Sequence, residues 1–332
     1  MRNSILRQCQ DTPTKSSGLT AFMHGRHGKE RRDSVTCEIL EDRRLHHVRL
    51  LAGVQKVDQD LVKYLWKLGL GGKRRRHRVY ASHETGAAGA ATHLTSAATG
   101  HPAFTHILPE IGFAGHSNSG KSTLVNAMAG FGPTSKLASV SDRAGWTDLI
   151  SFYMLGKKPP VLILADMPGY GHAVASTEAK RAWKLMIKNY VQNRVVLCRC
   201  CVLVDCTRGL CEEDVQFLKF LQKCHVDWIL VLTKADLLST ELLASCLTAV
   251  REDLVQLRLI SDSEEPKQFL SSKIKAVSAA TGAGVQMLWL DMVAAARKSS
   301  SSSSSSSDTV REHVRAFELR LNRSTRFPSS ST

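Results

Sequence analysis

The chain has 332 residues, enough for one large domain or two ordinary ones, and 43% of them are hydrophobic. No apolar run approaches the ~20 residues of a membrane-spanning helix, and no secretory signal is evident, so we expect no transmembrane segment and a reducing interior. The net charge of +15 is uneven, because residues 1–106 carry 18 Lys and Arg against 9 Asp and Glu, whereas residues 107–297 carry 21 against 18. These values predict one globular domain at 107–297 between two basic, largely disordered extensions, 1–106 and 298–332.

The N-terminal extension shows little sustained periodicity. Residues 1–29 contain a single acid among several Arg, Lys and Ser residues, a composition compatible with a mitochondrial presequence; the cytoplasm and another organelle are the alternatives. Leucines at helical spacing predict one amphipathic helix over Asp58–Leu70. The basic run Gly71–Arg78 either binds phosphate, acts as a nuclear signal or is a solvated charge run, and the Ala/Thr/Gly-rich segment Gly86–Gly100 is expected to be a linker.

A complete phosphate-binding motif, G-x-x-x-x-G-K-S, opens the globular region. An apolar segment over Glu110–Ala114 predicts the preceding strand, and Thr123–Met128 predicts the following helix. In that context successive backbone N–H groups point at phosphate oxygens, close to the positive end of the helix. A glycine-rich turn with a stray lysine is the alternative. The motif residues are Gly115, His116, Ser117, Asn118, Ser119, Gly120, Lys121 and Ser122.

A second motif ends the apolar run Pro160–Asp166, which is typical of a strand buried on both faces. We expect Lys121 to reach the β- and γ-phosphates, while Ser122 ligates Mg²⁺ and Asp166 supports the ion. A carboxylate that only caps a turn is the alternative for Asp166. The segment has the form D-x-x-G and consists of Asp166, Met167, Pro168 and Gly169, whose N–H is expected to sense the γ-phosphate.

Helices and strands alternate through the next hundred residues. A stripe of apolar residues predicts a helix over Ser176–Asn193, and another predicts a helix over Glu212–Gln222. Between them lies the apolar run Val195–Asp205, which holds several cysteines without paired C-x-x-C spacing, so a core strand is favoured over a zinc site. This alternation predicts an α/β fold with a mostly parallel, six-stranded sheet, helices on both faces and ligands at the carboxyl ends of the strands.

A third motif follows the predicted strand Trp228–Leu232 and specifies the base. A carboxylate at its end accepts hydrogen bonds from the ring N–H and exocyclic amine of guanine, whereas adenine would leave it unpaired. An ordinary strand-to-helix loop with a solvated Lys and Asp is the alternative. The motif residues are Thr233, Lys234, Ala235 and Asp236, and a weaker signal, expected to bring the Ala279 N–H near the guanine carbonyl, consists of Val277, Ser278 and Ala279.

The C-terminal extension begins with the serine run Ser299–Ser307, which is expected to be a flexible tether. Thr309–Glu312 resembles a capping box, and apolar residues along one face predict a short basic helix from Val310 to Leu321. This helix either docks on RNA or protein or folds only when it is bound.

The segment D-M-P-G-Y-G at Asp166–Gly171 resembles the signature of the EngB-type GTP-binding proteins, which belong to the TrmE-Era-EngA-EngB-septin class of P-loop GTPases. The resemblance covers roughly Ile107–Arg297 and implies a Ras-like domain that binds GTP or GDP with Mg²⁺ and acts in assembly of the large ribosomal subunit. It also implies a switch loop, altered here, of Gly145, Trp146, Thr147 and Asp148, in which Thr147 is the third Mg²⁺-side residue.

Two mechanistic expectations follow from this resemblance. Tyr170 stands where Ras-type enzymes have a water-orienting glutamine, so hydrolysis is expected to be slow without an activator. Asn118 matches an asparagine that helps hold K⁺ near the phosphates in related GTPases, or else it hydrogen-bonds only within the loop. We therefore expect Lys121, Thr147, Gly169 and Asn118 to be the catalytic groups of a monomer whose partner is the large ribosomal subunit or its precursor. A non-catalytic GTP-binding scaffold and a GTPase in another RNA-linked process are the rival hypotheses.

Overall fold

The computed structural model describes residues 57–72, 91–97, 108–129, 149–156, 160–170, 177–261 and 273–302. Its centre is a seven-stranded sheet with the strand order β1-β3-β4-β2-β5-β6-β7. Strands β4, β2, β5, β6 and β7 pair in parallel, whereas β3 pairs antiparallel with β4 and with β1. The strands are β1 (Ala91–Ala97), β2 (Glu110–Gly115), β3 (Ile150–Leu155), β4 (Leu162–Asp166), β5 (Leu197–Asp205), β6 (Trp228–Thr233) and β7 (Ile274–Ala276).

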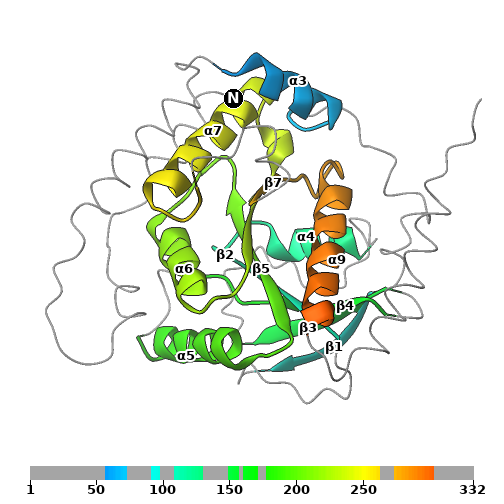
Figure 1. The fold of residues 1–332 in the computed structure, drawn as a ribbon, viewed down its shortest axis with the longest axis vertical. Coiled ribbons are helices and arrows are strands. Elements are labelled where there is room, and N and C mark those ends of the chain that lie inside the picture. Colours follow the sequence, from blue (N-terminus) through cyan, green and yellow to red (C-terminus); the bar gives the residue numbers. More distant parts are fainter. Residues whose placement is uncertain are drawn as a thin grey trace, which may run out of the picture.

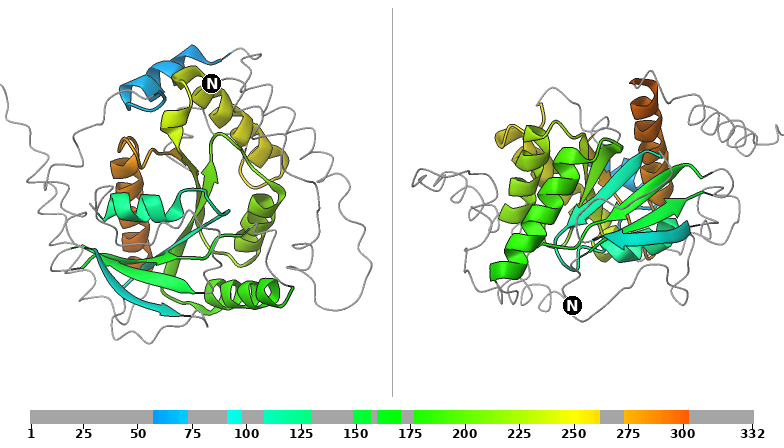
Figure 2. Two further views of the ribbon diagram at one scale, coloured as in Figure 1. Left: turned by 180° about the vertical axis from the view of Figure 1, so that it is seen from behind. Right: turned by 90° about the horizontal axis from the view of Figure 1, so that it is seen from below.

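Helices cover both faces of the sheet, as predicted (Figure 1). Seen from below, the sheet lies between α9 on one side and α5, α6 and α7 on the other (Figure 2, right). One apolar cluster joins the sheet to α3, α5, α6 and α7, and a second joins it to α4 and α9. The helices are α3 (Gln59–Lys67), α4 (Lys121–Met128), α5 (Thr177–Asn193), α6 (Glu212–Lys223), α7 (Thr240–Gln256), α9 (Val285–Ser302) and the 3₁₀ turn η3 (Ala235–Leu237).

The central strands form because their sequences suit burial on both faces. Every residue of β2 and β6 is buried, and so is all of β4 except Asp166, at its carboxyl end. The predicted stripes of α5 and α6 are buried as well, with Tyr190 and Leu218 fully inaccessible. Two cysteines of β5 behave as core residues, since Cys200 and Cys201 are buried free thiols.

The sheet has seven strands rather than the predicted six, because residues 91–97 form β1 instead of a linker. This strand is Ala- and Thr-rich and only half-buried, so it lacks the hydrophobic signal of a core strand. It is stabilised by backbone pairing to β3 and by a 3.0 Å hydrogen bond between Ser96 Oγ and Ser151 Oγ. The expected low order of residues 1–106 therefore does not hold for this segment.

The predicted helix at 58–70 is confirmed and packs on the domain as α3. Asp58 caps it by accepting the Asp60 N–H at 2.8 Å. Leu61 and Leu65 are buried in the cluster shared with α7, and the Gly72 N–H donates to Leu238 O at 2.5 Å. The segment is thus tied to the start of α7 rather than free.

Helix α9 continues through Ser302, so the start of the serine run is helical and not a tether. Serine is only roughly 0.5 kcal/mol less favourable than alanine in a helix, and the packed turns before Ser299 have already formed the nucleus. The rest of the serine run, the predicted helix at 310–321 and residues 1–29 lie outside the described residues. Among the residues that the structure describes, no helix is both long and apolar enough to cross a membrane.

Candidate nucleotide-binding site

The phosphate loop connects β2 to α4 and has the backbone geometry that its sequence predicts. Asn118 and Gly120 have left-handed backbone conformations, with φ of 64° and 89°, and the Ser119 N–H between them donates to His116 O at 3.1 Å. Gly115 has φ of 155°, and a Cβ placed on it would lie 2.4 Å from Leu203 O. The first glycine is therefore required both by its conformation and by the close approach of β5.

The lysine of the motif lies inside the loop. Lys121 Nζ donates to Gly115 O at 2.9 Å and to His116 O at 3.0 Å. Burial lowers the pKa of this ammonium to about 8, and the nearby Asp166 carboxylate partly opposes that fall. A half-buried cation held by carbonyl oxygens at the first turn of a helix is suited to meeting phosphate oxygens.

The two described residues expected beside Mg²⁺ lie together. Ser122 Oγ is 3.4 Å from Asp166 Oδ2, and the buried Asp166 Oδ1 has no hydrogen-bond partner among the described residues. Burial raises the pKa of Asp166 to about 6, against the effects of Lys121 and Ser122. An orphaned carboxylate oxygen beside a serine hydroxyl fits a hard cation with oxygen ligands, as Mg²⁺ is. The predicted switch residues Gly145, Trp146, Thr147 and Asp148 lie outside the described residues, so the third ligand stays a prediction.

The D-x-x-G segment runs along the phosphate loop. The Met167 N–H donates to Phe113 O at 2.9 Å, and Pro168 O accepts from Trp183 Nε1 at 3.1 Å. A Cβ placed on Gly169 would lie 2.8 Å from Lys121 Nζ. The glycine thus brings its backbone directly against the loop lysine.

The base-reading motif forms one wall of a cavity of about 230 Å³ beside the phosphate loop. Asp236 Oδ1 accepts the Ser278 hydroxyl at 2.5 Å, which in turn accepts the Thr281 N–H at 3.1 Å. Ala279 also lines this cavity, and its predicted contact with the guanine carbonyl stays a prediction. The lining residues include Gly120, Thr233, Lys234, Asp236, Val277 and Ala279.

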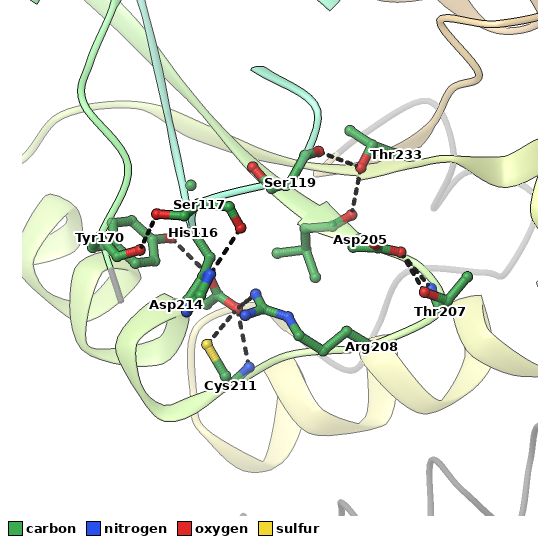
Figure 3. Close-up of polar contacts among 12 residues, drawn as sticks. His116, Ser117, Ser119, Tyr170, Asp205, Thr207, Arg208, Cys211, Asp214 and Thr233 are labelled. Atoms are coloured by element: carbon green, nitrogen blue, oxygen red, sulfur yellow. Dashed lines mark hydrogen bonds and ion pairs between the residues drawn. The ribbon is translucent and has the colours of Figure 1, made fainter. Parts of the chain in front are cut away.

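Thr233 connects the phosphate loop to the part of the site that contains Asp236. Its hydroxyl donates to Ser119 O at 2.6 Å, and it also lies 3.2 Å from Val204 O (Figure 3). Ala235, next in the motif after Lys234, is fully buried and donates its N–H to Val277 O at 3.2 Å. Thr233 therefore holds the phosphate loop against the strand that delivers Asp236.

Sequence reasoning missed several polar residues around this site. Asp205 forms an ion pair with Lys234 at 2.7 Å, which holds the lysine stem at the edge of the cavity. Asp205 ends an apolar strand, as Asp166 does, so its position in the sequence could have identified it as a site residue. Asp214 is fully buried and accepts the Tyr170 hydroxyl at 2.7 Å; in sequence it is indistinguishable from an ordinary acidic residue in the first turn of a helix.

Comparisons with known proteins agree with this geometry. A family model described as 50S ribosome-binding GTPase matches residues 110–234. The probable GTP-binding protein EngB of Rhodospirillum rubrum is 39% identical over 147 residues, which are 44% of this chain and 62% of that protein. Its counterpart in Anaplasma phagocytophilum is 35% identical over 181 residues, 54% of this chain and 86% of that protein.

Among solved structures, the crystal structure of a probable GTP-binding protein engB is 22% identical with a TM-score of 0.44, and the match covers 57% of this chain and 99% of that one. The family assignment does not depend on this structural match. It depends on the sequence relatives, the phosphate loop with its lysine and the Asp236 cavity. From these we conclude that the chain belongs to the EngB family of P-loop GTPases.

Proposed function

We propose that this protein is a GTP-dependent switch that hydrolyses GTP slowly with Mg²⁺ and acts in assembly of the large ribosomal subunit. The observation that carries the nucleotide part is the convergence on one site of a half-buried lysine in a phosphate loop, an orphaned carboxylate oxygen and a carboxylate at the wall of a cavity of about 230 Å³. Members of this family hydrolyse GTP to GDP and phosphate.

Slow hydrolysis is supported by the position of Tyr170. A water-orienting side chain must reach the γ-phosphate, but the Tyr170 hydroxyl is buried and donates to Asp214. The attacking water therefore needs another group to place it. We propose K⁺ held with the help of Asn118, whose left-handed backbone sits in the middle of the loop. Turnover that is equally fast in KCl and in NaCl would contradict the potassium proposal.

The ribosomal part is supported by the description of the matching family model and by the basic side chains of α5 and α6. These side chains include Arg181, Lys184 and Lys188 of α5 and Lys223 of α6. Burial raises the pKa of the Cys224 thiol, and both Lys223 and Lys188 act against that rise, so both ammonium groups act on the same thiol. Clustered cations of this kind suit the phosphate backbone of ribosomal RNA.

The experiment is sedimentation of the purified protein with large-subunit precursors in the presence of a non-hydrolysable GTP analogue or GDP. We expect co-sedimentation in the GTP state and its weakening in the double variant Lys188→Glu, Lys223→Glu. Lys67→Glu is the matched control, because it reverses an exposed charge on α3, at the other end of the domain (Figure 1). Nucleotide binding without turnover on subunits would favour the scaffold, and binding to other RNAs alone would favour a different RNA-linked process.

The compartment is proposed from the sequence of residues 1–29, whose basic and serine-rich composition suits a mitochondrial presequence. Imaging of the full chain fused at its C-terminus to a fluorescent protein tests this location. A cytoplasmic signal that is unchanged when residues 1–29 are deleted would contradict it.

A further inference from the structure

Tyr170 is held at both ends. Its carbonyl oxygen accepts the Ser117 N–H at 3.0 Å and the Ser117 hydroxyl at 3.2 Å, while its own N–H donates to Gly115 O at 3.3 Å. Its hydroxyl donates to Asp214 Oδ1 at 2.7 Å. Figure 3 shows the residue spanning the space between the phosphate loop and the start of α6. One residue thus connects the loop to a helix on the face of the sheet.

The Asp214 end of this connection is built independently of Tyr170. The carboxylate accepts the Cys211 N–H at 3.0 Å and the Cys211 thiol at 2.9 Å, and it pairs with Arg208 at 3.2 Å. Asp214 is completely buried. A buried carboxylate with three other donors is a fixed acceptor, so the tyrosine hydroxyl has one defined place to bind.

The tyrosine ring is also enclosed. Ring contacts join it to Trp183 at 6.2 Å, Phe217 at 5.7 Å and His116 at 6.2 Å between centroids. Burial and the neighbouring Asp214 carboxylate raise the pKa of Tyr170 well above its ordinary value, so its hydroxyl remains a donor. Moving the Tyr170 backbone away from Ser117 therefore disturbs the hydrogen bond to Asp214 as well.

A third phosphate has to use the same part of the loop. Its oxygens meet Lys121, and Gly169 packs so closely on Lys121 that a Cβ on Gly169 would lie 3.0 Å from Ser117 N as well as 2.8 Å from Nζ. Ser117 N–H already has Tyr170 O as its acceptor. We propose that the Tyr170–Asp214 pair is a specificity-determining latch, which holds the D-x-x-G segment against the loop and favours GDP over GTP until the third phosphate displaces it.

This inference rests on the proposed GTP-dependent function, and the dissociation constants of GDP and a non-hydrolysable GTP analogue test it. Tyr170→Phe removes the hydroxyl that reaches Asp214. We expect the ratio of the GDP constant to the GTP-analogue constant to rise by about tenfold, since a hydrogen bond to a charged group contributes on that order. Tyr190→Phe is the matched control, because its hydroxyl donates at 2.9 Å to another buried carboxylate, Glu110, away from the loop.

A ratio that is unchanged in Tyr170→Phe, or that rises equally in Tyr190→Phe, would overturn the latch while leaving the GTPase function intact. Failure to bind either nucleotide would refute the function itself.

Trp183 supplies a second measurement that needs no variant of Tyr170, because its Nε1 donates to Pro168 O and its ring meets Tyr170. In a Trp146→Phe background, which removes the tryptophan of the predicted switch loop, we expect the GTP analogue, but not GDP, to change tryptophan emission, and Trp183→Phe to abolish that difference. Identical emission with both nucleotides would also overturn the proposal.

Discussion

Replacing Asp236 by Asn should exchange guanine for xanthine as the preferred base. Asp236 is half-buried at the wall of the cavity, and the Ser278 hydroxyl holds one of its oxygens at 2.5 Å, so the carboxylate is fixed before the base arrives. Guanine offers it two donors, the ring N–H and the exocyclic amine. An asparagine amide at this position loses the charge and sets one of its own donors against a donor of the base.

The size of this effect follows from the partial exposure of Asp236. Two hydrogen bonds to a fully buried charge would contribute more binding free energy. At this half-buried position we expect the variant to lose about 3 kcal/mol of GTP binding free energy, which raises the dissociation constant of GTP about a hundredfold. Xanthosine triphosphate presents a carbonyl where guanine has its amine, so it should bind the variant with nearly the affinity of GTP for the wild type. Titration calorimetry with both nucleotides measures this, and Asp60→Asn on the exposed face of α3 is the control. An unchanged preference for GTP in Asp236→Asn would refute the assignment of this residue to the base.

The other predictions concern the buried charges. Because burial raises the pKa of Asp166 to about 6 from 3.8, the folded metal-free protein binds this proton more tightly than the unfolded chain, so Asp166 lowers stability as the pH rises from about 4 to 6. In thermal unfolding, Asp166→Asn should lack this decrease of stability with pH. Mg²⁺ should also tighten GTP binding to the wild type more strongly above pH 6 than below it. With the pKa of Lys121 near 8, GTP binding at pH 9 should take up a proton, and calorimetric heats that do not depend on the buffer would contradict this. Arg194→Ala leaves the fully buried Glu110 without its cation and should lower the free energy of unfolding by about 3–5 kcal/mol in denaturant titrations, whereas a loss below about 1 kcal/mol would mean that water reaches the carboxylate.

The three nucleotide motifs could be predicted from sequence because each demands particular residue types at a fixed spacing on a strand–loop–helix frame. The apolar runs likewise predicted β4 and β6, since both are buried on each side. The features that could not be predicted from sequence depend on contacts between segments that are distant in the chain. β1 is stabilised by its pairing with β3 and not by apolar residues, and the role of Asp214 appears only when Tyr170, 44 residues earlier in the chain, is seen to reach it.

The antiparallel edge of the sheet has a practical consequence for anyone shortening this chain. β1 comes from residues that precede the globular region predicted from the sequence, and it pairs with the outer backbone groups of β3. A truncated protein that starts at residue 107 would expose β3 as an unpaired, largely apolar edge strand. Exposed edge strands of this kind pair with strands of other chains and so promote aggregation. Protein prepared for biophysical work should therefore begin upstream of Ala91, so that β1 remains paired along the edge of β3.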